Sequence, residues 1–137
     1  MTAAGVHSPV CETVKATLEN LPEASLGVVY GSAATGRLTP ESDVDVAVAA
    51  DQPLSWERRM DWEGRLAAAL GRTVDLLDLR QAHGLILREA LSRGRLVFCR
   101  DRGLYAALIQ RMLGEQADFQ PLLDRMLAAR LARWTRP

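Results

Sequence analysis

Two aspartates and a Gly-Ser pair are the residues whose types and spacing could do chemistry in this chain. One residue separates Asp43 from Asp45, and ten residues lie between Ser32 and Asp43. In an extended strand, side chains two positions apart project from the same face, about 7 Å from each other. Two carboxylates placed so closely repel each other and are costly to leave unpaired. A divalent cation between them would resolve this repulsion.

The Gly31-Ser32 pair could supply the other half of a nucleotide site. Glycine lets the backbone approach a ligand closely. Ser32 adds a hydroxyl, and the backbone amides of such a turn can point at an anion. Phosphate-binding amides next to metal-binding carboxylates predict a site for a nucleoside triphosphate carried with Mg²⁺.

Short apolar runs, punctuated by polar residues and glycines, must position these groups. The pattern predicts strands at residues 26–30, 43–49, 73–79 and 95–99. It predicts helices at residues 9–21, 56–70 and 81–93. Strands that alternate with helices in this way indicate an α/β domain.

The expected helix at 56–70 carries an apolar stripe that we expect to cover the sheet. The stripe consists of Trp56, Met60, Glu63, Leu66, Ala67 and Leu70.

Two further helices are expected at the C-terminal end, one capped by Asp101 and ending at Gly114, the other capped by Asp118. Apolar residues in the second recur at steps of three and four: Phe119, Leu122, Leu123, Met126, Leu127, Leu131 and Trp134. This stripe either completes the core or binds a helical partner.

A third carboxylate is expected near the first two, because two-metal transfer chemistry needs a further ligand and a proton acceptor. Asp75 and Asp78 both lie on the predicted third strand. Their spacing places them on opposite faces, so alternation alone does not choose between them.

Composition bounds the class of protein. A chain of 137 residues is expected to form one domain. Its 17 basic and 17 acidic residues give a net charge of zero, which argues against direct binding to a long nucleic acid. The sequence has no apolar run of membrane-spanning length and no signal-peptide pattern, so we expect a cytoplasmic protein without membrane contact.

These motifs resemble a known family. Gly31-Ser32, ten residues, then Asp43-Val44-Asp45 is similar to the GS-x10-DxD signature of the DNA polymerase beta-like nucleotidyltransferase superfamily. With Gly36-Arg37 and Ser42 before the acids, the chain resembles the minimal nucleotidyltransferase (MNT) group. The resemblance implies a small mixed β-sheet flanked by helices over about residues 26–101, within a single domain 1–137 whose C-terminal helices span about 102–134.

The resemblance also implies roles for these residues. Asp75 becomes the third acid, because the family carries it at the first aspartate of a strand of the form VDLxDL. The resemblance implies that Asp43, Asp45 and Asp75 bind Mg²⁺, as two ions. It further implies that the nucleotide, ATP, is bound by Gly31, Ser32, Arg37 and Ser42.

The acceptor comes from the resemblance alone. MNT proteins are commonly antitoxins paired with HEPN-domain ribonucleases, which implies transfer of AMP to a protein hydroxyl, such as a tyrosine of that toxin. Larger relatives hold a small-molecule acceptor on a second domain, so here we expect an acceptor on a partner protein or at a dimer interface. Two alternatives stay open: an aminoglycoside-type nucleotidyltransferase, and a non-catalytic antitoxin that masks the toxin by binding.

Overall fold

A four-stranded mixed sheet forms the centre of the protein. The computed structural model describes residues 8–135, with side chains at 8–115, 125, 128 and 132. The strands are β1 (Ala24–Tyr30), β2 (Val44–Ala50), β3 (Val74–Asp78) and β4 (Arg95–Cys99), in the spatial order β3-β2-β1-β4. β2 and β3 run parallel, whereas β1 pairs antiparallel with both β2 and β4. The predicted α/β class with a small mixed sheet is confirmed.

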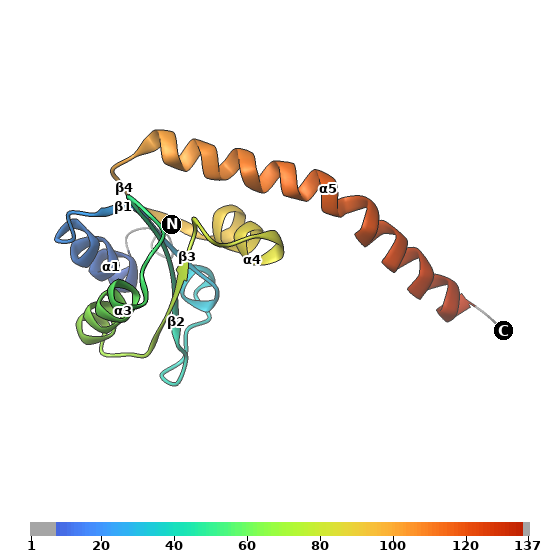
Figure 1. Ribbon diagram of the computed structural model, residues 1–137. Coiled ribbons are helices and arrows are strands. Elements are labelled where there is room, and N and C mark those ends of the chain that lie inside the picture. The colour runs from blue at the N-terminus through green and yellow to red at the C-terminus, as the bar shows by residue number, and fades with distance from the viewer. Residues whose placement is uncertain (1–7, 136–137) are drawn as a thin grey trace.

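Helices cover both faces of this sheet (Figure 1). α1 (Pro9–Glu19) and α3 (Trp56–Leu70) pack on one face. The other face is covered by α4 (Gly84–Arg88), the π-helical turn η1 (Glu89–Arg93) and the first part of α5 (Arg102–Thr135). The short helix α2 (Ser32–Thr35) follows β1 directly.

Polar residues begin the helices where the sequence predicts. The Ser8 hydroxyl accepts a hydrogen bond from the Cys11 amide at 3.2 Å, and the Ser55 hydroxyl accepts one from the Arg58 amide at 3.1 Å. A carboxylate oxygen of Asp101 accepts from the Leu104 amide at 3.0 Å. Such caps satisfy amides that have no partner within the helix.

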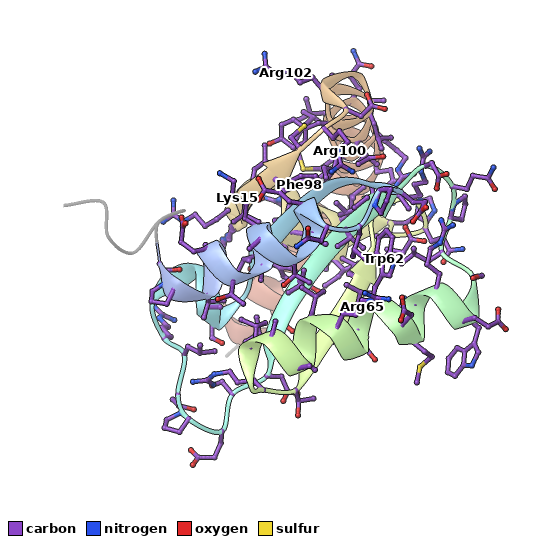
Figure 2. All side chains as sticks on the ribbon, turned by 90° about the vertical axis from the view of Figure 1, so that its left-hand side faces the viewer. Lys15, Trp62, Arg65, Phe98, Arg100 and Arg102 are labelled. Atoms are coloured by element: carbon purple, nitrogen blue, oxygen red, sulfur yellow. The ribbon has the colours of Figure 1, made fainter. Side chains whose placement is uncertain are left out.

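The expected apolar stripe of α3 is wrong at its first two positions. Trp56 and Met60 are 70% and 49% exposed, whereas Trp62 is 2% exposed and packs with Leu66 against the sheet. Figure 2 shows Trp62 between α3 and the strands. Positions 56 and 62 lie about 120° apart around a helix, so one helix cannot bury both tryptophans against the same sheet.

The C-terminal end also differs from the expectation. One continuous helix, α5, spans Arg102–Thr135 in place of two helices, so Gly114 does not end a helix and Asp118 does not begin one. A glycine inside a helix costs only about 1 kcal/mol, which a long helix tolerates. The predicted stripe from Phe119 to Trp134 lies outside the described side chains.

The expected helix at 81–93 likewise begins later, at Gly84, and changes to π-helical geometry at Glu89. No helix in the described part of the chain combines the length and the apolar character needed to cross a bilayer.

Candidate active site

Three polar side chains line up across three adjacent strands. Tyr30 at the end of β1 pairs in register with Asp45 of β2, and Asp45 pairs with Asp75 of β3. Residues paired in register project from the same face of a sheet, with Cβ atoms about 4.5–5.5 Å apart. That face also carries Ala47 and the core residues under α4 and α5. The row lies where this cover ends, so Asp45 is half-buried and Asp75 is exposed.

The row concentrates negative charge. Burial raises the pKa of the Asp45 carboxyl above its usual range, and the neighbouring charges of Asp75 and then Asp43 raise it further. Burial, followed by the charges of Asp45 and Asp75, raises the pKa of Tyr30 to about 12. Tyr30 therefore keeps its proton at neutral pH. A cation bound beside the acids would stabilise their ionised form.

Gly31 allows the chain to turn directly over Asp45. Its φ is 69°, in the left-handed region that favours glycine. A Cβ atom at this position would overlap a carboxylate oxygen of Asp45. Ser32 follows as the first residue of α2 and is half-buried. The amides of a first helical turn have no partner within the helix, so this turn presents donors close to the acids.

The loop between α2 and β2 carries the other sequence-predicted residues. Asp43 is exposed at the start of β2, close enough to raise the pKa of Asp45. Arg37 is exposed just after α2. The Ser42 hydroxyl instead accepts a hydrogen bond from the Thr39 amide at 3.0 Å, so it holds its own loop together.

Asp78 has a structural place apart from this row. It is 2% exposed and accepts hydrogen bonds from the amides of Leu54 at 2.8 Å and Arg80 at 3.0 Å. It ties the β2–α3 connection to the end of β3. The following helix begins at Gly84 with His83 in the capping position, so Asp78 does not cap that helix.

The acids fit a divalent cation that shares its coordination with a substrate. Within the described residues, no three His, Cys, Asp or Glu side chains are grouped so as to hold a metal ion by themselves. Mg²⁺ is commonly bound through one or two carboxylates together with substrate phosphates and waters. The pair Asp45–Asp75, with Asp43 and the Gly31-Ser32 turn beside it, suits that mode of binding.

Comparison with known families agrees with this geometry. Residues 12–103 match the family described as "Polymerase beta, Nucleotidyltransferase". The chain belongs to this nucleotidyltransferase family. The matched segment runs from α1 to the start of α5 and so contains every residue of the site described above.

Similar proteins with assigned activity also exist. The chain is 30% identical over 123 residues to the protein adenylyltransferase MntA of Shewanella oneidensis, covering 88% of each chain. A crystal structure of a toxin–antitoxin with AMP-PNP matches with a TM-score of 0.68 and 27% identity, covering 85% of this chain and 97% of that one.

A second solved structure is a tri-AMPylated Shewanella oneidensis HEPN toxin in complex with an MNT antitoxin. It matches with a TM-score of 0.58 and 28% identity, covering 80% of this chain and 87% of that one.

Two residues near the site were not singled out from the sequence as part of it. Tyr30 is buried in the core on the face covered by α4 and α5, and it is also the register partner of Asp45. The only sequence signal was its place directly before Gly31.

Arg72 donates hydrogen bonds to the carbonyls of Thr39 at 2.7 Å and Ser42 at 3.1 Å, and so fixes the loop that carries Asp43. This contact spans about thirty residues and has no local signal.

Proposed function

We propose that this nucleotidyltransferase moves AMP from ATP to a hydroxyl of a partner protein, a tyrosine of a HEPN-type ribonuclease toxin, and thereby acts as its antitoxin. The observation that carries the proposal is the row of Tyr30, Asp45 and Asp75 beneath the Gly31 turn. It occurs in a chain that is 30% identical to a protein adenylyltransferase over most of its length.

The three acids, the Gly31 turn and the loop before β2 then each have a defined role. Asp43, Asp45 and Asp75 would bind Mg²⁺, as two ions, which would neutralise the triphosphate and the charge that develops at the α-phosphorus. Gly31 and Ser32 would donate hydrogen bonds to the β- and γ-phosphates, with Arg37 free to reach the same oxygens. Ser42 would act indirectly, by holding the loop that carries Asp43.

The transfer itself is a displacement at phosphorus. The acceptor oxygen bonds to the α-phosphorus, the bond to the β-phosphate oxygen breaks, and pyrophosphate leaves. Asp75 would take the proton of the attacking hydroxyl, because it is exposed whereas Asp45 is half-buried. Positioning and charge neutralisation supply most of the rate, which suits a site with few side chains.

Related structures support ATP as the nucleotide and a HEPN-type toxin as the acceptor. One toxin–antitoxin structure contains AMP-PNP, an analogue of ATP. Another contains an AMPylated HEPN toxin with its MNT antitoxin. A third structure, with a TM-score of 0.69 and 25% identity, is a toxin–antitoxin variant in which two aspartates are replaced by glutamate. These two aspartates lie two positions apart, which is also the spacing of Asp43 and Asp45 in this chain. We place the reaction in the cytoplasm, where ATP and the RNA substrate of a ribonuclease are found together.

Intact-mass spectrometry of the partner tests this function. A HEPN-type partner protein is incubated with this chain, ATP and Mg²⁺, and the Asp43→Asn/Asp45→Asn variant serves as the control. We expect the partner to gain the mass of one or more AMP units with the native chain and none with the variant. A stable complex without any mass gain would contradict the transferase and favour an antitoxin that acts by masking.

A further inference from the structure

A groove of about 650 Å³ lies beside the candidate active site, at the outer edge of β3. Met60, Gly64 and Ala67 of α3 line it together with Ser42 and Asp43 of the loop and Val74 of β3. Asp43 thus belongs both to the groove and to the group of acids. A molecule in the groove would therefore contact one of the proposed metal-binding acids, Asp43.

The edge of β3 offers unpaired backbone groups inside this groove. β3 is the outermost strand of the sheet on this side. The Val44 amide donates to the Thr73 carbonyl at 3.0 Å, so Thr73 faces β2 and the backbone groups of Val74 point outward. The parallel register of β2 with β3 directs the Val74 amide and carbonyl away from β2, to the side where β3 has no neighbouring strand within the described residues.

The next outward-facing residue along β3 is already covered. The Leu76 amide donates to a carboxylate oxygen of Glu63 at 3.3 Å, and the Leu76 carbonyl accepts from the guanidinium of Arg59. These two side chains of α3 occupy the positions that a neighbouring strand would take. The edge is therefore closed at Leu76 and open at Val74, which limits pairing with another chain to a short segment.

The groove lies on the acceptor side of the site. Across the sheet, the Gly31 turn follows β1, Asp45 is on β2 and Asp75 is on β3, and the groove is bounded by Val74 of β3 and by α3. In transfer at phosphorus the attacking and leaving oxygens lie roughly in line on opposite sides of the phosphorus. If pyrophosphate leaves toward the Gly31 turn, the attacking hydroxyl must come from the side of β3.

We propose that this groove binds an extended segment of the acceptor protein, which pairs its backbone with Val74 and so places its hydroxyl beside Asp75. The proposal rests on the AMP-transferase function above and adds where the acceptor docks. Addition of a strand to an exposed sheet edge is a common mode of peptide recognition.

The charges of the groove specify the segment further. Glu41 is exposed along its wall, and the one basic lining residue, Arg72, donates hydrogen bonds to loop carbonyls. The acceptor segment should therefore carry a basic residue near its reactive hydroxyl.

Gly64 offers a sharp test. A Cβ atom added there would meet no atom within 4 Å, and Gly64 lies inside α3. Gly64→Trp would fill the groove, whereas Gly64→Ala would leave it open, and removing a helical glycine should not lower the melting temperature in either variant. Steady-state AMP transfer to the HEPN-type partner is measured for both variants and the native chain, with partner and ATP concentrations varied separately.

We expect Gly64→Trp to lower kcat/KM for the partner about thirty-fold, the factor that two backbone hydrogen bonds of ordinary net strength contribute. KM for ATP should stay unchanged, and Gly64→Ala should behave as the native chain. Unchanged transfer by Gly64→Trp would overturn the docking site while leaving the transferase intact. A raised KM for ATP would assign the groove to the nucleotide instead. Absence of transfer by the native chain would overturn the proposed function, and this docking site with it.

Discussion

At the scale of single residues, the surroundings of Asp45 carry the account. Gly31 closes over its carboxylate, Tyr30 flanks it on β1, and Asp75 flanks it on β3. The spacing of Gly31, Ser32, Asp43 and Asp45 is visible in the sequence, because these residues are local in the chain. The positions of Tyr30 and Asp75 next to Asp45 depend on strand register, which the sequence pattern does not specify.

Replacing Asp45 by asparagine should raise stability and remove activity. The pKa of Asp45 is raised in the folded protein. Its contribution to the free energy of unfolding is thus fully present below the unfolded-state pKa and is lost as pH rises through the folded-state pKa. At neutral pH, Asp45→Asn should therefore melt at a higher temperature than the native chain when Mg²⁺ and ATP are absent.

Thermal melts at several pH values check this prediction. The advantage of Asp45→Asn should vanish at acidic pH, where the native carboxyl is protonated, and should shrink when Mg²⁺ and ATP are added. A variant that melts below the native chain at neutral pH would show that the carboxylate is stabilised by partners other than a bound cation.

Gly31 and Gly36 form a matched pair for the turn beside the acids. Both have positive φ, 69° and 75°, but an added Cβ would overlap Asp45 only at Gly31 and would meet nothing within 4 Å at Gly36. We expect each alanine variant to lose about 1–2 kcal/mol of unfolding free energy from backbone strain. Only Gly31→Ala should also lose AMP transfer, and equal activity in both variants would argue against a role for the Gly31–Asp45 contact.

At the scale of elements, the strand positions and the starts of α1, α3 and α5 follow from the sequence, but the later helix ends and the buried faces do not all follow. Ser8, Ser55 and Asp101 cap helices as their types predict. The face of α3 was misassigned because its apolar residues lie on two sides, and only packing against the sheet selects Trp62. Asp78 lies on the same strand as Asp75, and the sequence pattern alone does not separate their roles. Asp78 accepts hydrogen bonds from the amides of Leu54 and Arg80, and the bond with Leu54 joins segments that are distant in the chain.

The two tryptophans of α3 test this assignment. Trp62 is 2% exposed and Trp56 is 70% exposed. Trp62→Ala should lower the free energy of unfolding by about 3–5 kcal/mol, because it leaves a large cavity under the helix. Trp56→Ala should change it by less than about 0.5 kcal/mol, as expected for an exposed side chain. Urea unfolding measures both, and a similar loss in the two variants would contradict the packing of α3.

At the scale of the whole molecule, the sheet separates a supporting face from a functional face. α1 and α3 bury one face, while the acids open on the other, where α4, η1 and α5 leave them accessible. α5 is held to the body by Arg111, which donates to the carbonyls of Leu79 at 2.5 Å and Ala82 at 2.8 Å, and then extends beyond it (Figure 1). The sequence predicts helical structure for this segment but not one continuous helix, because glycine and proline often end helices but do not always do so.

The central claim is that these acids transfer AMP from ATP to a partner protein. Its most direct test follows the label from ATP labelled at either the α- or the γ-phosphorus, with Mg²⁺, the HEPN-type partner, and either the native chain or Asp75→Asn. The account predicts that the α label becomes covalently attached to the partner, that the γ label leaves in pyrophosphate, and that Asp75→Asn lowers the rate about 100-fold or more. Attachment of the γ label, or undiminished transfer by Asp75→Asn, would contradict it.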